Sequence, residues 1–69
     1  MFLAENLASL RNARKFSQRE VSEALGMSVR SYIRYELGER EPSVTTLIAL
    51  ANYFDISLDA LVGRERKPD

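Results

Sequence analysis

The chain has 69 residues, of which 45% are hydrophobic and 29% are charged, and it contains neither cysteine nor histidine. This length fits one small domain, and the composition argues against a disordered chain or a disulfide-stapled fold. The commonest general base and the usual zinc ligands are missing, so the sequence predicts no enzyme, no metal and no cofactor. No apolar run approaches the roughly 20 residues that span a bilayer, and the first residues do not resemble a secretion signal. We therefore expect a cytoplasmic protein without a membrane partner, and no small-molecule ligand is evident.

The net charge is zero, with ten basic and ten acidic residues, but the two signs are unevenly spread. Residues 11–19 hold four cations and no anion, and Arg30 and Arg34 follow with no acid between them. Acids gather instead within residues 20–23, 36–41 and 55–59. This distribution predicts a dipolar surface with one basic face, although solvated helix faces would give the same pattern.

The apolar residues repeat at helical spacing, and no stretch alternates long enough to indicate a strand. Leu3, Leu7 and Leu10 indicate the first helix, at positions i, i+4 and i+7. Serines predict where the later helices begin, because a serine hydroxyl can accept a hydrogen bond from a free N–H of the first turn. These N-cap candidates are Ser17, Ser28, Ser43 and Ser57. The segment from Ser17 to Glu20 has the spacing of a full capping box.

Helix ends are indicated by residues that adopt left-handed backbone conformations at little cost, namely Gly26, Gly38, Gly63 and, less freely, Asp55. Start and end signals together predict helices near residues 2–14, 18–25, 29–37, 44–54 and 58–62. The sequence therefore predicts an all-α domain over residues 1–63. A charged flexible tail or the start of a linker follows at residues 64–69.

The second and third predicted helices are joined by a short turn through Gly26, and this arrangement describes a helix-turn-helix. The outer face of the third helix, residues 29–37, carries Val29, Arg30, Ile33 and Arg34. An α-helix fits the major groove of DNA, where this face would meet base edges. Solvated surface arginines and tolerated surface apolar residues would look the same.

The segment FSQREVSEALGMSVRSYIRYE, residues 16–36, resembles the phage repressor and Cro family of helix-turn-helix proteins. The segments at residues 37–43, 47–51 and 56–59 extend the resemblance, which covers about residues 7–63. The resemblance implies a compact five-helix, repressor-like domain from a bacterium or a phage. It also implies a transcription regulator, most often a repressor, that binds palindromic double-stranded operator DNA as a two-fold dimer.

The resemblance also implies roles for individual residues. Val29, Arg30 and Arg34 match positions that read bases, and Ile33 lies beside them on the same face. Phosphate contacts are implied for Gln18, Ser31, Arg40 and Ser43. Arg11 and Glu36 match a buried ion pair that ties the first helix to the third.

Two further expectations concern partners. The last helix leaves Leu58 facing outward, and Leu58 with Ile56 makes a small apolar patch suited to a weak homodimer that DNA stabilises. Glu39 and Glu41 stand in a segment that is more often basic in the family, which puts phosphate affinity in doubt. These acids and the zero net charge leave an alternative open, a protein-interaction module of the same fold, adaptor-like or antitoxin-like, with little or no DNA binding.

Overall fold

The computed structural model describes residues 3–63, and the tail expected at residues 64–69 lies outside this range. Within it the chain forms five α-helices and no strand. The helices are α1 (Leu3–Ala13), α2 (Gln18–Ala24), α3 (Val29–Glu36), α4 (Val44–Phe54) and α5 (Leu58–Val62). The all-α prediction is confirmed. The first three helices each end one residue earlier than predicted.

All four predicted serine N-caps are present, at the starts of α2, α3, α4 and α5. In each case the serine side chain accepts a hydrogen bond from the backbone N–H three residues later. At α2 the capping box is complete, because the Glu20 carboxylate also accepts from the Ser17 backbone N–H at 2.9 Å. A serine N-cap typically contributes about 1 kcal/mol, so the four caps together are a large share of the stability of so small a domain.

The left-handed turns also lie where the sequence predicts them. Gly26, Gly38 and Gly63 have φ of 69°, 72° and 76°, and Asp55 has φ of 55°. One left-handed residue was not predicted: Lys15 has φ of 58° in the turn between α1 and α2. There the Phe16 and Lys15 backbone N–H groups donate to the carbonyls of Arg11 and Asn12, so two hydrogen bonds close the turn despite the side chain.

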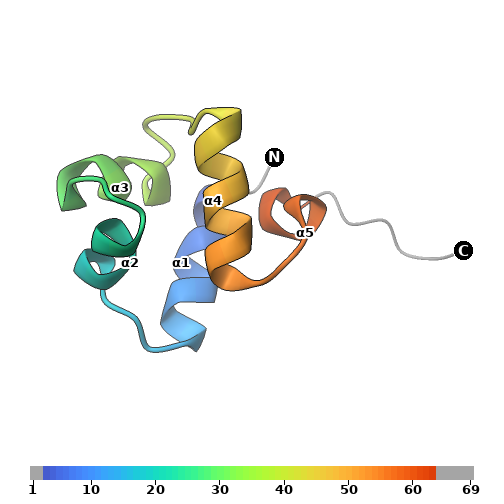
Figure 1. Ribbon diagram of the computed structural model, residues 1–69, viewed down its shortest axis with the longest axis horizontal. Helices are drawn as coiled ribbons and strands as arrows, with labels where there is room; N and C mark the ends of the chain where they lie inside the picture. The colour runs from blue at the N-terminus through green and yellow to red at the C-terminus, as the bar shows by residue number, and fades with distance from the viewer. Residues whose placement is uncertain (1–2, 64–69) are drawn as a thin grey trace, which may run out of the picture.

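In the view of Figure 1, α2 and α3 lie on one side of α4 and α5 lies on the other. α1 packs against α3 and α5, α2 packs against α3, and α4 packs against α5. One apolar core joins them, and full burial of a Leu, Val or Phe side chain contributes about 1.5–3 kcal/mol. Its buried members are Leu3, Leu7, Val21, Tyr32, Tyr35, Leu50, Ala51, Phe54, Leu61 and Val62.

Candidate nucleic-acid interface

The turn between α2 and α3 holds the two helices close together. Ser22 is 1% exposed, and its hydroxyl donates to the Arg19 carbonyl at 2.9 Å, so a small side chain fills the junction without an unpaired polar group. Gly26 takes the left-handed conformation, and the Met27 N–H donates to the Ser22 carbonyl at 3.0 Å. α3 is thereby held across α2 with one face open to solvent.

The other face of α3 is fixed to α1 by an ion pair. The Arg11 Nε and Nη2 atoms donate to the two Glu36 carboxylate oxygens at 2.6 and 3.0 Å, which is a bidentate contact. The side chains are 14% and 7% exposed. A third guanidinium N–H, on Nη1, donates to the Phe16 carbonyl at 3.0 Å. The structure thus brings together the two residues for which the resemblance implied a buried pair.

These contacts keep Glu36 ionised although it is largely buried. Burial opposes its ionisation, but the hydrogen bonds from its neighbours, Arg11 foremost, hold the pKa of Glu36 below its usual range. The same hydrogen bond raises the pKa of Arg11. The Tyr32 hydroxyl is buried nearby and has no hydrogen-bond partner within residues 3–63. Burial and then the Glu36 carboxylate raise the pKa of Tyr32 well above its usual range, so this hydroxyl stays neutral.

Gln18, for which a phosphate contact was expected, makes an internal contact. Its Nε2 donates to Glu36 Oε1 at 3.2 Å, which adds α2 to the junction of α1 with α3. The side chain amide has two N–H groups, and this bond uses one of them. Gln18 therefore braces α3 in the unbound protein, and its phosphate contact stays a prediction.

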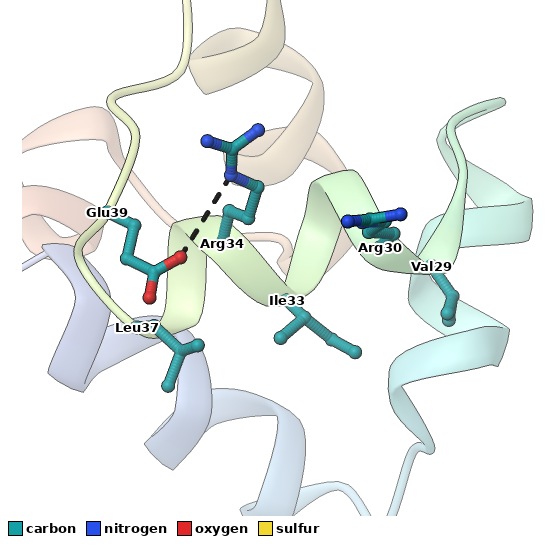
Figure 2. A pocket seen from close by; sticks show the side chains of 6 residues that line it. All are labelled: Val29, Arg30, Ile33, Arg34, Leu37 and Glu39. Atoms are coloured by element: carbon teal, nitrogen blue, oxygen red, sulfur yellow. Dashed lines mark ion pairs between the residues drawn. The ribbon is translucent and has the colours of Figure 1, made fainter.

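A surface groove of about 460 Å³ runs along the open face of α3. Figure 2 shows Val29, Ile33 and Leu37 pointing to one side of the helix, while Arg34 points to the other. Sequence reasoning placed four of the lining residues on this face and missed Leu37 and Glu39. The full lining is Val29, Arg30, Ile33, Arg34, Leu37 and Glu39.

The two arginines of the groove have different neighbours. Arg30 is exposed and forms no ion pair with any residue of the described range. Arg34 Nε lies 4.0 Å from Glu39 Oε1, and the two side chains are 52% and 58% exposed (Figure 2). Glu39 was expected only as a repulsive charge in the loop, and the structure places it beside a predicted reading arginine.

The remaining phosphate candidates lie at helix starts and in the loop before α4. Ser43 caps α4 and also bonds to the Thr46 hydroxyl at 3.1 Å, and Ser31 bonds to the Ser28 hydroxyl at 3.0 Å. Arg40 is exposed and lines a smaller hollow beside Gly38. The Ser43 hydroxyl donates in its bond, whereas the Ser31 hydroxyl accepts and keeps its own O–H donor. Phosphate binding at both serines stays a prediction.

Of the two residues predicted to form a dimer contact, Leu58 begins α5 and Ile56 lies two residues before it. Leu58 is 41% exposed, whereas Ile56 is half-buried and packs against the core. Ile56 also lines a mainly apolar groove of about 350 Å³ between α1 and α5. α5 lies on the opposite side of α4 from α3 (Figure 1), so a dimer through α5 would leave the α3 groove open.

Residues 3–63 contain no helix that is long and apolar enough to cross a membrane. No group of three potential metal-ligating side chains was found there either.

Two short helices, a glycine turn and an open groove on the second helix define a helix-turn-helix domain. The family model described as helix-turn-helix, of the Cro/C1 type, matches residues 7–61, and the chain belongs to this family.

Relatives and a solved structure agree with that assignment. The chain is 42% identical over 62 residues to the HTH-type transcriptional regulator YqaE of Bacillus subtilis, covering 90% of this chain and 53% of that protein. It is 38% identical over 64 residues to the cryptic phage CTXphi transcriptional repressor RstR of Vibrio cholerae, covering 93% and 57%. A crystal structure of a transcriptional regulator from Listeria innocua matches with a TM-score of 0.86 and 35% identity, covering 96% of this chain and 62% of that one. The chain therefore spans about half the length of the curated relatives it matches.

Proposed function

We propose that this domain binds double-stranded DNA as part of a transcription regulator, with α3 in the major groove. The observation that carries the proposal is the open groove of α3, in which the exposed Arg30 lies next to Val29 and Ile33. An arginine can donate two hydrogen bonds to guanine O6 and N7, and branched apolar side chains can contact thymine methyl groups. The names of the relatives, two of them a regulator and a phage repressor, support the same function.

Phosphate contacts would position α3 without reading sequence. We assign them to residues at the start of α2, in the first turn of α3, in the loop before α4 and at the α4 N-terminus. A helix N-terminus favours a bound anion, because its free N–H groups and its dipole both point at the ligand. The assigned residues are Gln18, Ser31, Arg40 and Ser43.

The domain would bind a palindromic operator as a weak homodimer joined through Leu58 and Ile56. Leu58 is the one large apolar side chain on α5 that is more than a third exposed, so the patch is small and gives little affinity in solution. Leu58→Glu should remove cooperative operator binding and leave the monomer folded. Unchanged cooperativity in this variant, measured by titration of one-site and two-site duplexes, would rule out this surface.

The proposal is tested by measuring binding to a random-sequence duplex at several salt concentrations. DNA binding through cations falls steeply with salt, because each neutralised phosphate releases a counterion. We expect binding at low salt that weakens with a linear slope on a double-logarithmic plot. No binding at the lowest salt concentration would contradict the proposal.

The second candidate is a protein-interaction module of the same fold. The pairing of Arg34 with Glu39 and the zero net charge favour it, since both reduce the positive field at α3. A protein with that role would bind neither random nor selected duplex. Under either function the domain acts by binding rather than by catalysis, and we assign it to the cytoplasm, where bacterial DNA lies.

A further inference from the structure

We propose that Glu39 sets the DNA specificity of this domain by orienting Arg34, a role that rests on the proposed DNA-binding function. Glu39 would act through Arg34 rather than on the DNA, as a positioning residue. Its carboxylate holds the guanidinium for guanine and weakens its attraction to phosphate.

The backbone fixes Glu39 beside its partner. α3 ends in the left-handed turn at Gly38, where φ is 72°. In this turn the Glu39 backbone N–H donates to the carbonyl of Arg34 itself, at 3.0 Å. The turn that ends α3 therefore places the Glu39 carboxylate next to Arg34. The backbone of the turn itself brings the two side chains close together.

The contact leaves the reading end of the arginine available. Glu39 Oε1 lies 4.0 Å from Arg34 Nε, the nitrogen nearest the helix. The two terminal amino groups keep four N–H donors, and Figure 2 shows them beyond the contact with Glu39. A guanine needs only two such donors. Arg34 can thus read a base while the Glu39 carboxylate stays close to its Nε.

The Glu39 carboxylate should disfavour a phosphate bound at Arg34 more than a guanine bound there. A phosphate near Arg34 would meet the negative charge of Glu39 at close range, whereas guanine O6 and N7 are uncharged acceptors. Both side chains of the pair are about half exposed, so the pair is weak and can shift when DNA arrives. Glu39 should therefore lower the affinity for arbitrary sequences more than the affinity for the operator.

The test compares two duplexes, one selected by the parent protein from a random pool and one with the same bases scrambled. Glu39→Gln keeps the shape of the side chain and removes its charge. The matched control is Glu41→Gln, which removes a charge from the same loop at an exposed residue with no ion pair in the described range. Both variants are also made in an Arg34→Ala background, and circular dichroism checks that each one is folded.

We expect Glu39→Gln to lower the ratio of selected to scrambled affinity about threefold, the size of effect an exposed ion pair can produce. Its salt slope on the scrambled duplex should steepen by about one, because the released arginine now binds a phosphate. Glu41→Gln should change both affinities by the same factor. In the Arg34→Ala background Glu39→Gln should behave like Glu41→Gln.

The proposal is overturned if Glu39→Gln shifts both duplexes equally, or if its effect survives in the Arg34→Ala background. In both cases the preference of the parent for the selected duplex would still support the proposed DNA-binding function. A parent protein that binds neither duplex would overturn the function and this role together.

Discussion

Helix α3 takes part in two arginine–glutamate pairs, and they differ in nearly every physical respect. Arg11 and Glu36 are joined by two hydrogen bonds and are 14% and 7% exposed. Arg34 and Glu39 meet at 4.0 Å and are 52% and 58% exposed. The same two residue types therefore serve two purposes. The inner pair fixes where α3 lies, and the outer pair leaves a cation on its surface that a ligand can use.

The largest expected effect is the loss of the inner pair. Glu36→Ala leaves the Arg11 guanidinium buried without its counter-charge, which should cost about 3–5 kcal/mol in the free energy of unfolding. In a domain of this size that corresponds to a fall in Tm of more than about 10 °C. Thermal unfolding followed by circular dichroism measures it.

Replacing both partners should cost less than replacing one. The double variant Arg11→Met with Glu36→Leu removes the buried charge along with its partner, so no ion is left unpaired. A Glu36→Ala variant that melts like the parent would show that the pair does not stabilise the fold.

The next effect concerns Arg34 in the outer pair, whose loss should lower DNA affinity but leave the stability of the fold almost unchanged. Arg34→Ala should reduce affinity for the selected duplex by roughly 1–3 kcal/mol if Arg34 reads a base. Its free energy of unfolding should stay within about 1 kcal/mol of the parent value, because the arginine is half exposed. A large loss of stability in Arg34→Ala would remove the contrast between the two pairs.

Acid should weaken the inner pair selectively. The folded-state pKa of Glu36 lies below the ordinary value of 4.5, so its ionisation stabilises the fold above that pH. This share of the stability is lost as the pH falls through the folded-state pKa. The Tm difference between the parent and Glu36→Gln should therefore narrow below pH 4.5. A constant difference across the titration, with Glu41→Gln as the exposed control, would argue against this linkage.

The smallest effect is on the stability contributed by the outer pair. Glu39→Ala should change the free energy of unfolding by less than about 1 kcal/mol, because an exposed ion pair in water gains little. Chemical denaturation measures this value. A cost close to that of Glu36→Ala would mean that Glu39 is structural and not available for the role proposed above.

Local signals explain why the helices could be predicted. Each serine N-cap and each glycine turn works through its own few residues, so the printed sequence contains the whole cause. Lys15 shows the limit of this reasoning. Its left-handed conformation comes from the way the chain must turn from α1 into α2, and lysine itself has no preference for it. Ala24 follows the buried Val21 at helical spacing, yet it is exposed. Spacing alone does not fix how far an apolar stripe extends, because its edge depends on tertiary packing.

The candidate site also has features that the sequence predicts and features that depend on tertiary contacts. The reading face of α3 follows from helical spacing, and Leu37 continues the row of Val29 and Ile33 at i+8, a signal that the sequence contains. The contact of Glu39 with Arg34 has no such signal, because it forms across a non-helical turn. The bond from Gln18 to Glu36 joins two helices, and its partner could not be named from spacing.

The most direct test of the account is selection of bound sequences from a random duplex pool, carried out with the parent and with Arg30→Ala. The parent should return a palindrome with half-sites about one helical turn, or roughly 34 Å, apart. Arg30→Ala should return the same palindrome with one position relaxed in each half-site, because one guanine contact is lost. Enrichment of no motif by the parent, or an unaltered motif in Arg30→Ala, would contradict the assignment of α3 as the reading helix.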